Sequence, residues 1–178
     1  MIRFTVFARD YQYRGKMIHC GPEPQGSARA MIITDKKTGR PRAAVFTDNP
    51  DLELWRKEVT KAAEAAVFML TGENPFPIRK PFPARVDLKF FLTAPASVKR
   101  AWPSVKPDGD KLERGIFDAL TGVLFEDDSQ VCEGSWSKQY GVPERVEIEV
   151  SECAQPENQL FSNSATTTRS NASLPLLG

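Results

Sequence analysis

The sequence predicts an α/β (α+β) fold in which a small mixed β-sheet packs with two main helices in a single domain. Alternating apolar and polar residues occur near both ends of the chain, as in half-buried strands. Two other segments repeat apolar residues at helical spacing. A length of 178 residues, with 40% hydrophobic and 26% charged residues, suits one domain with a substantial core.

The first part of the chain predicts a strand, a loop and a hairpin. Residues 1–7 alternate and form the expected first strand, and the polar stretch 8–30 is expected to be a loop. Within 29–47, two apolar runs flank a turn that contains Gly39 and Pro41, which predicts a hairpin.

A long helix is predicted to follow the hairpin. Asp48 and Pro50 are typical of a helix start, because a short polar side chain caps the helix and proline fits its first turn. Apolar residues at helical spacing then extend the helix to about Leu70. Trp55 and Phe68 lie among them, and we expect both to pack in the core rather than to stack on a ligand.

The second half predicts three strands and a second helix, for which Asp110 and Glu113 form a capping-box pattern. The expected elements are strands over 84–93, 130–138 and 145–150, a loop over 94–107 and a helix over 110–122. We assign residues 1–152 to the folded domain. Residues 153–178 are polar and of low complexity, so a disordered tail is expected there.

Composition argues against several classes of protein. No run of 18 apolar residues could span a membrane and the start does not resemble a signal peptide, so we expect a cytoplasmic protein without a membrane partner. Three cysteines form no CxxC pair, which argues against zinc, and a single histidine, His19, argues against Ser–His–Asp chemistry. The net charge is +1, so a surface for nucleic acid must concentrate positive charge on one face.

Acidic residues gather on both sides of the second predicted helix. Asp108 and Asp110 precede it, and Glu126, Asp127 and Asp128 follow it. Carboxylates are ligands that Mg²⁺ prefers, and two such ions can activate water against a phosphodiester. If the chain folds back, the two loops converge on a metal site. The alternative is that Asp108 and Asp110 form a helix cap and an Asx turn, while residues 126–128 form a solvated turn. The spacing of the acids does not match the calcium-binding loop of an EF-hand.

Basic residues near these carboxylates favour phosphate as a ligand. Arg114 lies one helical turn after Asp110 and one before Asp118, so it can pair with either or stabilise charge on a phosphate. The neighbouring cations are Lys99, Arg100, Lys106, Lys111 and Arg114. A second basic patch on the predicted hairpin, which either contacts phosphate or is merely solvated, consists of Arg29, Lys36, Lys37, Arg40 and Arg42.

Several segments together resemble a family signature. They are Lys106–Leu112, Phe117–Val123, Asp127–Val131 and Lys138–Tyr140. This pattern is similar to that of RusA-type crossover-junction endodeoxyribonucleases from bacteria, phages and prophages, and a looser likeness covers residues 21–29. The resemblance implies a small α/β homodimer that binds four-way junctions and other branched DNA and cuts them with magnesium or manganese, in DNA recombination and repair.

The same resemblance assigns roles to individual residues. Asp108, Asp110 and Asp128 match the catalytic, metal-binding aspartates, and Asp127 matches their acidic neighbour and is a further candidate metal ligand. Arg114 stands where many members carry a functional lysine and is therefore a catalytic candidate. The residues expected to contact DNA are Lys99, Arg100, Lys106, Lys111, Lys138, which matches the closing lysine of the signature, and Arg29.

Two positions depart from the family pattern. Lys111 stands where many members have asparagine. Arg114 keeps the charge of lysine but does not release its proton, so we expect it to stabilise charge rather than to act as a general acid. Residues 8–20 look like an insertion. Three hypotheses remain: a Holliday-junction resolvase, a nuclease that trims forks or flaps, and a branched-DNA-binding protein with weak or no catalysis.

Overall fold

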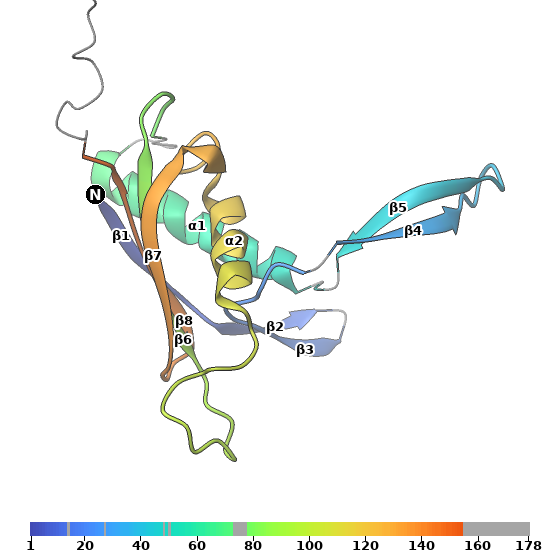
Figure 1. The fold of residues 1–178 in the computed structure, drawn as a ribbon, viewed down its shortest axis with the longest axis horizontal. Helices are drawn as coiled ribbons and strands as arrows, with labels where there is room; N and C mark the ends of the chain where they lie inside the picture. The colour runs from blue at the N-terminus through green and yellow to red at the C-terminus, as the bar shows by residue number, and fades with distance from the viewer. Residues whose placement is uncertain (14, 27, 48, 50, 73–77, 155–178) are drawn as a thin grey trace, which may run out of the picture.

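The computed structural model describes residues 1–154 apart from residues 14, 27, 48, 50 and 73–77. Four strands form one sheet, in the order β1 (Ile2–Phe7), β8 (Arg145–Glu152), β6 (Ala84–Leu92) and β7 (Val131–Tyr140). The β6–β7 pair is parallel and the other neighbouring pairs are antiparallel. This mixed sheet, with two helices against it, confirms the predicted fold class (Figure 1).

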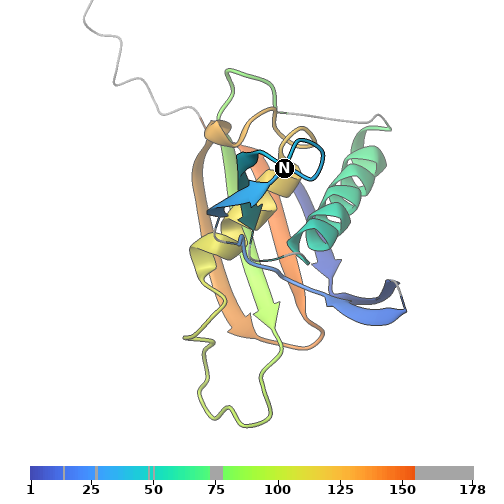
Figure 2. The same ribbon diagram turned by 90° about the vertical axis from the view of Figure 1, so that its right-hand side faces the viewer.

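Both helices, α1 (Leu52–Thr71) and α2 (Gly109–Leu120), lie on the same face of the sheet (Figure 2). The buried stripe of α1 consists of Leu52, Trp55, Val59, Ala63 and Val67. Trp55 is 1% exposed, as predicted, but the prediction for Phe68 is wrong because its side chain is 57% exposed. Phe68 follows Val67 directly and so points about 100° away from the stripe.

The unit β6–α2–β7 places the loops before and after α2 at opposite ends of the sheet. Parallel strands need a crossover connection, and here it consists of a long loop, α2 and the short 3-10 helix η1 (Asp128–Gln130). α2 therefore begins near the carboxyl ends of β6 and β7 and leads back to where β7 starts. Gly109 lies so close to the Trp136 ring that a Cβ atom would clash with it.

Two hairpins lie beside the sheet. The predicted hairpin is confirmed as β4 (Ala28–Thr34) and β5 (Pro41–Thr47), an arm that extends away from the sheet (Figure 1). The expected loop over 8–30 is wrong over most of its length, because it contains the hairpin β2 (Arg9–Tyr13) and β3 (Lys16–Cys20). His19 holds this hairpin, with Nδ1 2.8 Å from an Asp10 oxygen and Nε2 2.9 Å from a Glu144 oxygen.

The helix starts differ from the sequence expectations. Asp51 is the N-cap residue of α1; Asp48 and Pro50 lie outside the described residues. α2 begins directly after Asp108, so the predicted Asp110–Glu113 capping box is wrong. The predicted tail lies outside the described residues from 155 onward. Within the described part of the chain, no helix is long and apolar enough to cross a membrane.

Candidate functional site

Asp108 and Asp110 lie at the start of α2 and are both exposed. Asp108 is the N-cap residue with an extended backbone, but its carboxylate makes no capping hydrogen bond and lies 3.8 Å from Lys111 Nζ. Asp110 makes no hydrogen bond or ion pair with a described residue. Burial of Glu113 and, to a smaller extent, the negative charge of Asp110 raise the pKa of Glu113. This end of α2 therefore offers two accessible carboxylates with a third acid nearby.

Strand β7 fixes the segment that leads into these aspartates. Lys138 Nζ donates hydrogen bonds to the carbonyl oxygens of Val105 and Pro107, both at 2.7 Å. The Trp136 ring packs against Gly109 on the other side of Asp108. Lys138 thus reaches the start of α2 from β7, but its ammonium is occupied by backbone carbonyls. Its expected contact with DNA stays a prediction.

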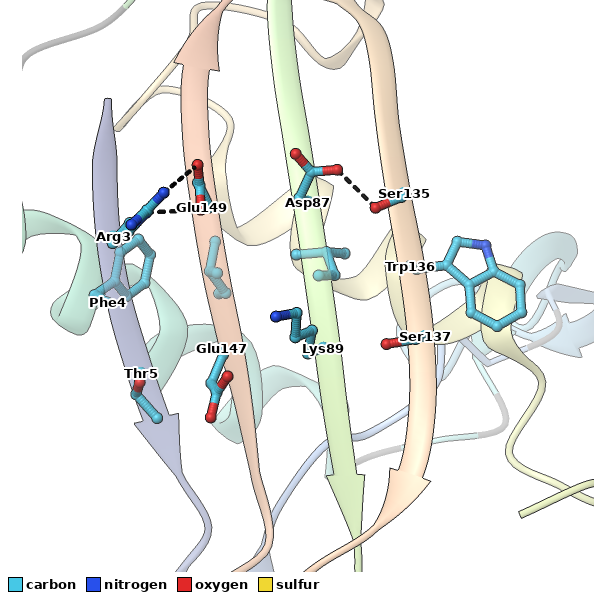
Figure 3. A pocket seen from close by; sticks show the side chains of 12 residues that line it. Arg3, Phe4, Thr5, Asp87, Lys89, Ser135, Trp136, Ser137, Glu147 and Glu149 are labelled. Carbon is cyan, nitrogen blue, oxygen red and sulfur yellow. Dashed lines mark hydrogen bonds and ion pairs between the residues drawn. The ribbon is translucent and has the colours of Figure 1, made fainter. Parts of the chain in front are cut away.

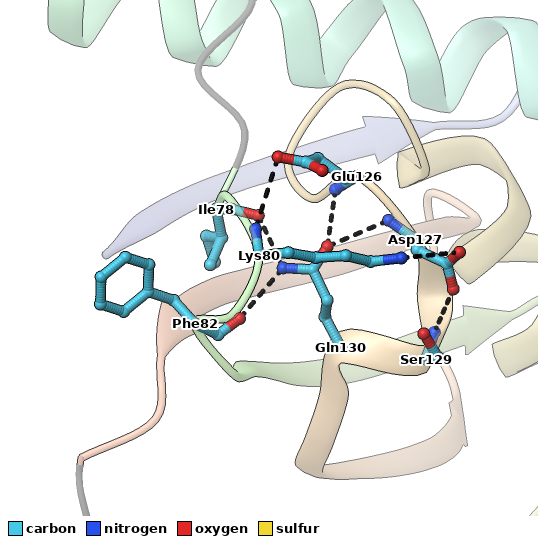
Figure 4. Close-up of polar contacts among 7 residues, drawn as sticks. All are labelled: Ile78, Lys80, Phe82, Glu126, Asp127, Ser129 and Gln130. Carbon is cyan, nitrogen blue, oxygen red and sulfur yellow. Dashed lines mark hydrogen bonds and ion pairs between the residues drawn. The ribbon is translucent and has the colours of Figure 1, made fainter.

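A second acidic group lies at the opposite end of α2 and is organised by the buried side chain of Gln130 (Figure 4). The Gln130 amide nitrogen donates to the carbonyl oxygens of Ile78 and Phe82 at 2.8 and 3.0 Å. Its amide oxygen accepts from the backbone N–H groups of Glu126 and Asp127 at 2.9 and 3.1 Å. The first two bonds join the turn that carries the acids to the segment before β6, and the other two lie within the turn.

Within this turn, Asp127 and Asp128 have different environments. Asp127 caps η1 by accepting from the Ser129 backbone N–H at 3.0 Å, and it pairs with Lys80 Nζ at 3.2 Å. These bonds to Ser129, followed by the Lys80 charge, lower the pKa of Asp127 to about 2. Asp128 is exposed and makes no hydrogen bond or ion pair with a described residue. Of the two, Asp128 is therefore the carboxylate available to a ligand.

A single chain does not bring the two acidic groups together. α2 has 12 residues, which at about 1.5 Å per residue separates its ends by about 18 Å. β7 also indicates that the two acidic groups are separated. Its residue Trp136 contacts Gly109 at the start of α2, whereas Asp128 lies before Val131, the first residue of the strand. Among the described residues, no group of three or more His, Cys, Asp or Glu side chains is arranged to hold a metal ion. The expected convergence of the two loops does not occur in one chain, and metal binding stays a prediction.

Uncompensated positive charge lies at the Asp108 end of α2. Four cations there make no ion pair with any residue that the structure describes: Lys99, Arg100, Lys106 and Arg114. Of the alternatives for Arg114, pairing with Asp110 or Asp118 does not occur among the described residues, and Asp118 contacts Arg56 instead. On the hairpin arm, Arg42 lies 3.7 Å from Asp35, while the side chain of Arg29 lies outside the described residues.

The uncovered face of the sheet offers a contrasting surface. A hollow of about 500 Å³ lies there among the side chains of all four strands (Figure 3). Most of its charges compensate one another, since Arg3 pairs with Glu149 at 2.7 Å and Asp87 accepts from Ser135 and Arg85, also at 2.7 Å. Lys89 also lines the hollow and makes no ion pair with a described residue. A single unpaired cation attracts an anion less than the group of cations beside accessible acids at the start of α2.

Some residues of the site were not found from the sequence. Alternation predicts Gln130 as the first residue of a strand. The spacing of Asp127 and Gln130, three residues apart, is that of a capping box, and this signal could have predicted the role of Gln130 in the turn. Lys80 lies 47 residues before Asp127 in the sequence, and no local pattern links the two. Glu113 was expected to cap the helix, and instead it is partly buried near Asp110.

The fold and the site define a small α+β protein with accessible carboxylates beside free cations at a strand–helix junction. Residues 22–151 match the family described as Endodeoxyribonuclease RusA, and the chain belongs to this family of nucleases. It is also 33% identical over 82 residues to an uncharacterized protein of Bacillus subtilis (strain 168), YqaN. That match covers 39% of this chain and 58% of the relative, so the chain spans less than two thirds of that protein's length.

Proposed function

We propose that the chain is a metal-dependent endonuclease that acts as a homodimer and resolves Holliday junctions and other branched DNA in recombination and repair. The observation that carries the proposal is the pair Asp108 and Asp110, accessible at the start of α2 beside uncompensated cations, in a chain of the RusA family. The cations would attract the phosphate backbone toward these carboxylates.

The residues at the start of α2 fit a magnesium or manganese ion. Mg²⁺ is usually held by one or two carboxylates, with water and substrate phosphate completing its shell. Asp108 and Asp110 would supply those carboxylates, and Asp110 has no partner among the residues that the structure describes. A bound divalent ion would supply charge stabilisation and a more acidic water for phosphodiester hydrolysis. Lys111 lies 3.8 Å from Asp108 and competes with a cation there, so Asp110 is the stronger ligand candidate.

The position of Asp128 gives the homodimer a chemical role. Two oxygens that ligate one Mg²⁺ lie within about 4 Å of each other, because each bond is about 2.1 Å long. Asp128 is separated from Asp110 by the length of α2, so it can join the site only from a second copy. A two-fold dimer would pair the start of one α2 with the acidic turn of the other, twice, and present two sites to the two symmetry-related strands of a junction.

Arg114 contributes charge to this site. It lies one turn after Asp110 on the same face of α2, is exposed, and makes no ion pair with a described residue. Its guanidinium stays protonated and can bind two phosphate oxygens at once, so its role is to position the strand and offset developing negative charge.

The test is cleavage of a synthetic four-way junction in Mg²⁺ or Mn²⁺ by the wild-type chain, Asp110→Asn and the control Asp118→Asn. Asp118 lies on the same helix but contacts Arg56, so its variant should cut normally. Asp110→Asn should bind the junction and fail to cut it. Normal cutting by Asp110→Asn would refute the assigned site. Binding without cutting by the wild-type chain would favour a branched-DNA-binding protein, and equal cutting of flaps and junctions would favour the fork or flap nuclease.

A further inference from the structure

The loop between β6 and α2, residues 93–108, extends beyond the end of the sheet (Figures 1 and 2). It presents Trp102 to solvent with 63% of the residue exposed and Val105 with 51% exposed. Between them, Pro103 is buried. The two bonds from Lys138 also anchor the loop at Val105 and Pro107. Trp102 is therefore displayed by an anchored segment of the fold.

The same loop is cationic throughout. Residues 93–107 contain Lys99, Arg100 and Lys106 and no acidic residue, and the first carboxylate after them is Asp108. None of the three cations forms an ion pair within the described part of the chain. An exposed indole among free cations matches the chemistry of nucleic acid, in which phosphates bind the cations and bases offer flat faces for stacking.

We propose that Trp102 stacks on a base that is unpaired or terminal at the branch point of DNA, and so helps the chain to distinguish branched from linear DNA. In continuous duplex each base is covered by its neighbours, whereas a branch point exposes base faces. The loop leads directly into Asp108, so a base held by Trp102 would place the adjoining phosphates near the proposed cleavage site. This inference rests on the proposed function for its substrate.

The experiment measures binding in EDTA, which prevents cutting, to a four-way junction and to linear duplex of the same sequence. Stacking contributes about 1–3 kcal/mol per base, so Trp102→Ala should weaken junction binding roughly 5- to 150-fold. Duplex binding, which depends on phosphate contacts, should change little. Trp102→Phe keeps an aromatic face and should retain most of the affinity. Phe68→Ala, a control at an aromatic residue 57% exposed on α1, should change neither affinity.

A fluorescent base analogue at the branch point gives a direct readout. Its emission should change on binding the wild-type chain and Trp102→Phe but not Trp102→Ala, with circular dichroism confirming that each variant is folded. Equal losses on junction and duplex, or no loss on either, would overturn the proposal. Failure to cut in Mg²⁺ with the Trp102 effect intact would refute the nuclease function alone. Normal cutting without a Trp102 effect would refute the stacking alone.

Discussion

The proposed sharing of the site between two copies can be tested by complementation. Asp110→Asn and Asp128→Asn remove an acid in the first turn of α2 and an acid beyond its end, and the 12 residues of this helix span about 18 Å. Two ligands of one Mg²⁺ must lie within about 4 Å, so one chain cannot supply both. Each variant alone should fail to cut, because every site in each homodimer lacks one acid.

A heterodimer of the two variants should recover one site. One of its sites combines the two substituted acids, and the other combines the intact Asp110 of one copy with the intact Asp128 of its partner. The expected rate of strand cutting is therefore about half that of the wild-type dimer, which has two intact sites. Because the intact site is single, the heterodimer should nick one strand rather than make the paired cuts that resolve a junction.

The assay uses two affinity tags, co-expression and purification of the doubly tagged dimer, followed by cleavage of a junction labelled on opposed strands. The matched control combines Asp108→Asn with Asp110→Asn. Both substitutions lie at the same end of α2, so each of its sites keeps one substitution and no cutting should return. If the Asp110→Asn with Asp128→Asn heterodimer is folded, dimeric and as inactive as this control, the two-copy site is refuted.

Three further changes test the fold around the site. Gly134→Ala would bring a Cβ atom onto the Val86 carbonyl oxygen and should lower the free energy of unfolding by about 2–3 kcal/mol in a urea titration; an unchanged midpoint would contradict the close approach of β6 and β7. Gln130→Leu would remove the partner of two carbonyls, of which that of Ile78 is buried, and of two N–H groups, with an expected loss of about 3–5 kcal/mol by thermal unfolding. A loss under about 1 kcal/mol would show that water replaces the amide. The pKa of His19 is raised by its hydrogen bonds to two carboxylates, so the charged imidazolium stabilises the β2–β3 hairpin. This stabilisation is complete below pH 6.5 and is lost as the pH rises through the higher pKa of the folded state. Hydrogen exchange of the β2–β3 amides, corrected for intrinsic rates, should increase over that range in the wild type and not in His19→Gln.

Periodicity was enough to predict most of the main elements. The sheet strands, both helices and the hairpin arm follow from alternation and from helical spacing, because burial of one face imposes those periods on the sequence. The prediction for Phe68 was wrong because an apolar residue next to the buried stripe fits a loose helical pattern while its side chain points elsewhere. The β2–β3 hairpin was not predicted because its strands bury little apolar surface, and Glu144, which anchors it, lies far along the chain from His19.

The candidate residues follow from the sequence, whereas the sequence analysis expected the wrong arrangement for them. The acids and cations could be identified from charge and from the family signature. Their separation could also have been derived, since a parallel β6–β7 pair connected by α2 must place the two flanking loops at opposite ends of the sheet. The choice of Asp128 over Asp127 gains support from the hydrogen bonds and the Lys80 pair that occupy Asp127, which no sequence pattern reports.

The length of α2 also has a consequence for control of the activity. Under the proposed arrangement, a newly synthesised chain is inert, because it carries two complementary halves that cannot meet within one molecule. The concentration of competent enzyme then rises with the square of the chain concentration until dimers predominate. Such a protein would be harmless to DNA at trace levels and would become active over a narrow range of expression, without an inhibitor or a separate activator.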